Sequence, residues 1–81
     1  MQISVHFYSY FKELTGCVDT VEIVQAGATI GHLLQQLHMR FPKLAAMQHS
    51  TLIAVGVDYQ DRNYRLKEGD VVSLFPPVQG G

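Results

Sequence analysis

The sequence predicts a small α+β domain in which one long helix covers one face of a mixed β-sheet. Strand-like segments stand on both sides of a single long amphipathic segment with helical spacing. At 81 residues, the chain is expected to form one domain with a single hydrophobic core. We expect this domain to span residues 1–75, and residues 76–81 to form a flexible C-terminal tail.

The first two strands are predicted from alternating apolar and polar residues. Residues 2–7 have the period of two that a half-buried strand requires. Residues 8–14 are richer in aromatic and polar side chains and are followed by a glycine, which is consistent with a helical turn and a break. Residues 20–24 alternate again and place Val21 and Ile23 on one side of the strand. We expect these two strands to pair like a hairpin.

The long helix is predicted to begin after Thr29, a residue type that caps helix N-termini well. Apolar residues then recur at helical spacing as far as Phe41, while polar residues such as Gln36 and Arg40 face elsewhere. Pro42 is expected to end the helix, because proline cannot continue the hydrogen-bonding pattern. A leucine-rich stripe of this kind predicts core packing and not a cofactor site.

The second half of the chain predicts two more strands and several turns. Residues 43–51 are expected to form a connector, and residues 52–55 a buried strand. Residues 56–63 are turn-rich, residues 64–66 are a candidate short edge element, and residues 71–75 form the last strand. The first and last strands are candidates for central neighbours, since both are strongly apolar. This order of elements is the outline of a β-grasp fold.

Composition excludes several classes of function. Six basic and seven acidic residues give a net charge of -1, so no basic field for nucleic acid is expected. No apolar run is long enough to span a bilayer, and the N-terminal residues do not resemble a signal peptide. The single cysteine, Cys17, cannot form an internal disulfide and is interpreted as a small apolar loop residue. A cytoplasmic protein without membrane contact is therefore expected.

The titratable residues predict neither a metal site nor an active site. His32 and His38 are expected on different faces of the helix, and His6 and His49 fall in separate elements. The carboxylates, Glu22 among them, are expected in turns or on polar strand faces, where they would be solvated. No phosphate-binding glycine loop or nucleophile motif is present in the sequence. An enzyme that acts on its own is not expected.

The tail offers a different kind of chemistry. Pro76 and Pro77 are expected to stop the last strand and favour an extended path. The six tail residues could then reach roughly 20 Å at ~3.3 Å per residue. Gly80 and Gly81 have no Cβ, so the terminal carboxylate could enter a narrow active site of another protein. Adenylation with ATP would activate it, and a sulfur nucleophile could then convert it to a thiocarboxylate.

Several segments together resemble the small subunit of molybdopterin synthase, the MoaD-type ubiquitin-like sulfur carriers. The resemblance covers nearly the whole chain and rests on residues 11–16, 27–34, 66–70 and 75–81. The Pro-Pro-Val-x-Gly-Gly ending is the most specific of these. One departure is Gly56, where the family commonly has asparagine, and this puts a local turn in question.

The resemblance implies a cycle of activation and sulfur transfer. A MoeB-like, E1-type enzyme would adenylate Gly81 with ATP, and a sulfur donor protein would supply the sulfur. A MoaE-like large subunit would accept the tail and provide the catalytic residues, in a heterotetramer. The thiocarboxylate would sulfurate cyclic pyranopterin monophosphate to give the dithiolene of molybdopterin. The chain itself would be a cosubstrate without a permanently bound cofactor.

The expected partner surface is the strip that leads into the tail and the tail itself: Phe75, Pro76, Pro77, Val78, Gln79 and Gly80. Buried aromatic side chains often anchor interfaces of this kind. Phe7, on the neighbouring strand, either joins this strip or belongs to the ordinary core.

Three other functions stay open from the sequence. The chain could carry sulfur for thiamine thiazole synthesis or tRNA thiolation, although the Phe-Pro-Pro-Val segment favours the molybdopterin type. It could be a ubiquitin-like tag that is joined through Gly81 to lysines of other proteins, which isopeptide adducts would reveal. It could also be a plain β-grasp interaction module, for which deletion of Gly80 and Gly81 would change nothing.

Overall fold

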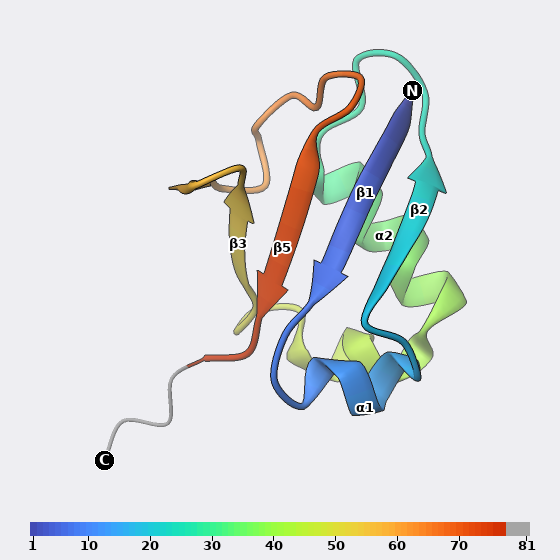
Figure 1. Ribbon diagram of the computed structural model, residues 1–81, viewed down its shortest axis with the longest axis vertical. Coiled ribbons are helices and arrows are strands. Elements are labelled where there is room, and N and C mark those ends of the chain that lie inside the picture. Colours follow the sequence, from blue (N-terminus) through green and yellow to red (C-terminus); the bar gives the residue numbers. More distant parts are fainter. Residues whose placement is uncertain (78–81) are drawn as a thin grey trace.

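The computed structural model describes residues 1–77 as a mixed β-sheet with a long helix packed across one face (Figure 1). The five strands lie in the order β2-β1-β5-β3-β4. In chain order the elements are β1 (Gln2–Phe7), α1 (Phe11–Thr15), β2 (Asp19–Ile23), α2 (Ile30–Arg40), the 3₁₀ helix η1 (Pro42–Met47), β3 (Leu52–Val55), β4 (Asp58–Tyr59) and β5 (Val71–Phe75). None of the helices in residues 1–77 has the length and apolar character needed to cross a membrane.

The first and last strands lie side by side at the centre of the sheet, as predicted (Figure 1). They run parallel, with Ser4 opposite Val71 and Phe7 opposite Leu74. Strand β1 also pairs with β2 in antiparallel orientation, which confirms the expected pairing of the first two strands. Because β1 and β5 are parallel, the chain leaves both strands at the same edge of the sheet.

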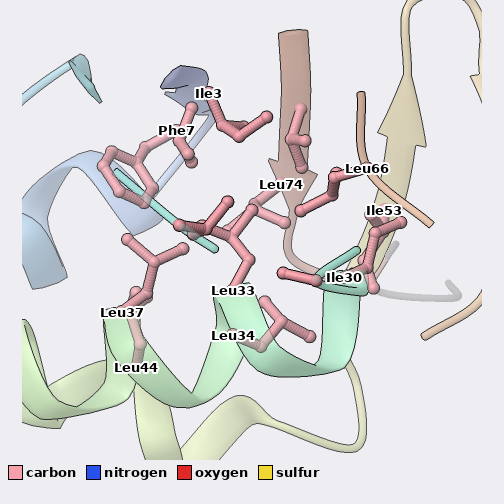
Figure 2. Packing of buried hydrophobic residues seen from close by; sticks show 14 of the residues in the cluster. Ile3, Phe7, Ile30, Leu33, Leu34, Leu37, Leu44, Ile53, Leu66 and Leu74 are labelled. Carbon is pink, nitrogen blue, oxygen red and sulfur yellow. The ribbon is translucent and has the colours of Figure 1, made fainter. Parts of the chain in front are cut away.

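The core lies between the sheet and the apolar stripe of α2 (Figure 2). Ile30, Leu33, Leu34 and Leu37 of this helix are buried, as the helical spacing predicted. They pack against side chains from the inner face of the sheet, including Ile3, Phe7, Ile53 and Leu74. Burial of each such side chain contributes about 1.5–3 kcal/mol. This packing fixes the central strands, and with them the start of the tail.

Helix α2 begins and ends where the sequence predicts. Thr29 caps its N-terminus by accepting a hydrogen bond from the backbone N–H of His32 (3.3 Å). In return, Nδ1 of His32 accepts from the backbone N–H of Thr29 (3.0 Å), so an imidazole takes the place that glutamate has in most capping boxes. Arg40 is the last helical residue, and Phe41 precedes Pro42, the first residue of η1.

The prediction that Glu22 is solvated is wrong. Its side chain is 2% exposed, since Glu22 and Val24 lie on the inner side of the sheet, whereas Val21 and Ile23 lie on the outer side. Arg40 forms a salt bridge with the Glu22 carboxylate. The side-chain amide of Gln36 donates to the same carboxylate at 2.9 Å. The burial of a charge is tolerated here because the helix provides these partners.

The region between β3 and β5 also differs from expectation. Residues 58–59, expected in a turn, form the edge strand β4. Residues 64–66, expected as an edge element, make only an isolated bridge between Thr29 and Arg65. Leu66 is buried, and its N–H donates to the carbonyl of Ala28 (2.9 Å), so this segment packs beside the start of α2.

Candidate functional site at the start of the C-terminal tail

The candidate site lies where β5 ends and the tail begins. Of the predicted partner residues, the structure describes Phe7, Phe75, Pro76 and Pro77. Val78, Gln79, Gly80 and Gly81 lie outside the described residues. The three residues at the end of β5 and the start of the tail are partly exposed, which leaves their side chains accessible to a partner.

Phe75 lies on the outer face of the sheet and stacks against Tyr8. The ring centroids are 4.6 Å apart and the ring planes differ by 15°. The backbone N–H of Tyr8 donates to the carbonyl of Leu74 (3.2 Å), which continues the contact between β1 and β5 beyond Phe7. Tyr8 was not predicted as a site residue. Its position directly after β1 could have indicated this role, because parallel pairing of β1 with β5 brings the residue after Phe7 beside Phe75.

Phe7 does not belong to this surface, and its predicted place on a partner surface is wrong. Its side chain is 1% exposed and packs edge-on against Phe41, with ring centroids 5.7 Å apart. The register explains this difference. Phe7 pairs with Leu74 on the inner face, and the next residue along β5, Phe75, points to the opposite face.

An open apolar groove of about 360 Å³ borders the start of the tail. Phe75, Pro76 and Pro77 line it on one side, together with Leu52 and Tyr59 from β3 and β4. Leu52 lies directly opposite Phe75 in the sheet, and Tyr59 is 73% exposed. Sequence reasoning missed both, because β4 was not predicted and Leu52 was assigned to a buried strand.

Ser9 and Tyr10 complete the lining of this groove. Ser9 has a φ of 56°, in the left-handed region that non-glycine residues seldom adopt. Such a conformation costs of order 1–3 kcal/mol and persists only where surrounding contacts maintain it. Here the carbonyl of Ser9 accepts from the N–H of Lys12 (3.1 Å) in the turn that leads into α1. The turn places Ser9 and Tyr10 beside Phe75 and the two prolines.

Further apolar side chains lie on the outer face of the sheet, among polar residues such as Ser4, His6 and Ser73. We define the outer sheet face by its exposed apolar side chains, Val21, Ile23, Leu52, Tyr59 and Val71, together with the partly exposed Phe75 and Tyr8, which is stacked on it. Strand register puts Val21 and Val71 on one side, since both pair with Ser4. A partly apolar face of this kind, beside the start of the tail, is suited to protein binding.

The groove can bind but offers little chemistry of its own. Among its lining residues in the described part of the chain, no side chain is a carboxylate, imidazole, amine or thiol. Within residues 1–77, no three His, Cys, Asp or Glu side chains are grouped to hold a metal ion. Cys17 is a free, half-buried thiol away from the groove lining.

Solved structures with this architecture confirm the predicted β-grasp fold. SAMP1 from Haloferax volcanii superimposes with a TM-score of 0.89 over 100% of both chains, at 21% identity. In a complex of subunits 1 and 2 of the molybdopterin-converting factor from Helicobacter pylori, the matching chain is 28% identical. Its TM-score is 0.73, and the match covers 100% of both chains.

Curated relatives are similar over the same length. The molybdopterin synthase sulfur carrier subunit of Escherichia coli is 32% identical over 81 residues, which cover 98% of this chain and 99% of that protein. Small archaeal modifier protein 3 of Haloferax volcanii is 29% identical over 92 residues, with 100% of both chains covered. The ThiS family matches residues 5–81, nearly the entire sequence, and the chain therefore belongs to the ThiS family.

Proposed function

We propose that this chain is the sulfur carrier subunit of a molybdopterin synthase and that Gly81 carries the sulfur as a thiocarboxylate. The observation that carries this proposal is the full-length similarity to curated sulfur carrier subunits, together with a family match that extends to Gly81. The apolar face beside the start of the tail supports it, because a carrier must dock before its tail can enter a partner.

The proposed chemistry takes place at the carboxylate of Gly81. In a MoeB-like enzyme, a carboxylate oxygen attacks the α-phosphorus of ATP, and pyrophosphate leaves. A sulfur nucleophile from a donor protein then attacks the acyl carbon, and AMP leaves. This nucleophile is the terminal sulfur of a persulfide on the donor, so its attack forms an acyl disulfide. A second thiol then attacks the donor-side sulfur of that S–S bond and forms a disulfide with it, and the thiocarboxylate of Gly81 leaves. Gly80 and Gly81 suit this route, since neither residue carries a side chain that would crowd the acyl carbon.

The proposed acceptor is a MoaE-like large subunit, which would contain the catalytic residues for sulfuration of cyclic pyranopterin monophosphate. The similarity to a chain solved in complex with its second subunit supports such a pairing. We assign docking to the outer sheet face and the groove, with the Tyr8–Phe75 stack as the anchor. Two carriers and two large subunits would form a heterotetramer. The single cysteine suits work in the reducing cytoplasm.

The proposal is tested by incubating the protein with a MoeB-like enzyme, ATP and a sulfur source, followed by mass spectrometry of C-terminal fragments. Exchange of one oxygen for sulfur at Gly81 is expected. Fragment mapping is essential, because oxidation of a methionine adds nearly the same mass. A variant with one residue appended after Gly81 should gain no sulfur. An unmodified Gly81, under conditions that charge a control carrier, would contradict the proposal.

A second candidate function is that of a ubiquitin-like protein modifier. The similarity to small archaeal modifier protein 3 favours it, and the same activated carboxylate would serve. In this case the acyl carbon of Gly81 would be attacked by a lysine amine of a target protein and form an isopeptide bond. Isopeptide-linked fragments in cell lysate would support this function, whereas thiocarboxylate without such fragments would support the carrier alone.

A further inference from the structure

A second groove, of about 430 Å³, lies along α2 and shares no lining residue with the groove beside the tail. Three segments form it: helix α2 from its N-cap to its last turn, the connection after η1, and the connection between β4 and β5. Its volume falls in the range of small-molecule sites.

The lining of this second groove is rich in groups that are or can become cationic. Three of the chain's four histidines, His32, His38 and His49, line it together with Arg62. No carboxylate is among its lining residues in the described part of the chain. Asp61, the carboxylate next in sequence to Arg62, does not line the groove and accepts from the N–H of Asn63 (2.8 Å). The lining of this groove is therefore locally cationic in a protein whose net charge is -1.

A backbone hydrogen bond holds Arg62 beside α2, and its guanidinium forms no salt bridge with a described carboxylate. Its carbonyl accepts from the N–H of Gly31 (3.0 Å), which fixes the β4–β5 connection against the first turn of α2. Within residues 1–77 the only salt bridge joins Arg40 and Glu22, so the Arg62 guanidinium is not neutralised by a described carboxylate.

The histidines offer donors of two kinds. Nδ1 of His32 accepts from the N–H of Thr29 (3.0 Å), so the proton of the neutral ring is on Nε2 and can be donated to a ligand. His38 and Arg62 line the same groove. The positive charge of Arg62, after burial, lowers the pKa of His38.

The backbone of the helix N-terminus contributes little to this site. The N–H groups of Ile30 and Gly31 already donate to the carbonyls of Tyr64 and Arg62 (both 3.0 Å), and that of His32 donates to Thr29. Recognition of an anion therefore depends on side chains. Gln35, Gln48 and Asn63 also line the groove and can supply neutral amide donors.

We propose that this groove binds a phosphate group, either free phosphate or the phosphate of a nucleotide, through Arg62, His38 and His49. A guanidinium fork and imidazolium donors form charge-assisted hydrogen bonds with a tetrahedral dianion. Protonation of His38 adds a positive charge to this lining, so an anion whose own charge does not change, such as sulfate, binds more tightly as the pH falls. Burial and the charge of Arg62 lower the pKa of His38, so this gain comes below the usual range for histidine.

The test is a ¹H–¹⁵N NMR titration of the full chain with sodium sulfate, with ionic strength held constant by sodium chloride. Sulfate keeps two negative charges between pH 7.5 and 5.5, so any pH dependence comes from the protein. We expect saturable shifts at Gly31, His38 and Asn63, and binding several-fold tighter at pH 5.5. Saturating sulfate should also raise the pKa of His38.

Two arginine variants provide a matched comparison. Arg62→Gln is expected to weaken sulfate binding by about tenfold, the loss of one charge-assisted hydrogen bond. Arg65→Gln changes the net charge equally on an exposed arginine outside the groove and should bind like the wild type. Titrations with inorganic phosphate and with AMP then distinguish the two sources of the phosphate group. Shifts that do not saturate, or that are equal in both variants, would overturn the proposal.

Discussion

Tyr8 and Phe75 form a stacked aromatic pair on the face of the sheet that carries no helix, with ring centroids 4.6 Å apart. The two residues come from opposite ends of the sequence. The parallel pairing of β1 and β5 brings them together at the point where the tail begins. The proposed docking surface is therefore a direct product of the sheet topology.

Phe75→Ala and Tyr8→Ala should each weaken binding of the large subunit by about 2 kcal/mol, roughly 30-fold in Kd, because aromatic anchors dominate interfaces. Isothermal titration calorimetry with the large subunit measures the change. Met39→Ala is the matched control, since Met39 is exposed on α2 and remote from the outer sheet face. Wild-type affinity in both aromatic variants would show that docking uses another surface.

In contrast to Tyr8 and Phe75, substitution of Phe7 should lower the stability of the domain and leave binding of the large subunit unchanged. Phe7→Ala removes a core side chain and is expected to cost about 3–5 kcal/mol of unfolding free energy. Phe7→Leu should cost less and keep the domain folded for binding studies. Urea denaturation gives the stability, and the folded Phe7→Leu variant should bind the large subunit with wild-type affinity. If Phe7→Leu weakened binding without loss of stability, Phe7 would belong to the interface after all.

Much of the fold follows from the sequence because the relevant signals are local. The leucine stripe of α2, its Thr29 cap and its end before Pro42 each depend on neighbouring residues, and the structure confirms them. The central position of β1 and β5 follows from their apolar content.

The parts that the sequence did not predict depend on contacts between distant segments. Alternation in β2 left open which side is buried, and Arg40 of α2, eighteen residues away along the chain, makes burial of Glu22 possible. Tyr8, Leu52 and Tyr59 become site residues only through strand register and the unpredicted β4. The proposed role of the Gly81 carboxylate rests on the sequence and its resemblance alone, because Gly81 lies outside the described residues.

Arg40→Ala should lower the free energy of unfolding by roughly 2 kcal/mol, because the buried Glu22 carboxylate loses its cationic partner. Arg40 is half exposed, which keeps this loss below that of a fully buried pair. Adding Glu22→Gln to Arg40→Ala should recover part of the stability, since a neutral amide is easier to bury. Arg65→Ala serves as the control. Additive losses in the double variant would contradict a direct interaction.

Stability should also depend on the protonation of His38. Its pKa in the folded state lies below the ordinary value of 6.5, so below that pH the unfolded chain binds more protons than the folded one. The wild type should therefore lose stability as the pH falls from 6.5 through the folded pKa. His38→Gln should flatten this decline in urea denaturation between pH 7.5 and 5.5, in chloride buffer without sulfate or phosphate. An unchanged pH profile in His38→Gln would exclude His38 as its source.

Gly56 lies in the turn between β3 and β4, at the position where the family that the sequence resembles commonly has asparagine. Its φ of 61° lies in the left-handed region, and a Cβ at this position would meet no atom within 4 Å. The backbone conformation, and not a lack of space, therefore limits which residue types fit at position 56. Asparagine adopts the left-handed region more readily than most other non-glycine residues. Gly56→Asn should change the unfolding free energy by less than about 0.5 kcal/mol, whereas Gly56→Val should cost about 1–2 kcal/mol. Equal losses in thermal denaturation would indicate that the turn rejects any side chain, and that the glycine here is not interchangeable with the asparagine of the family.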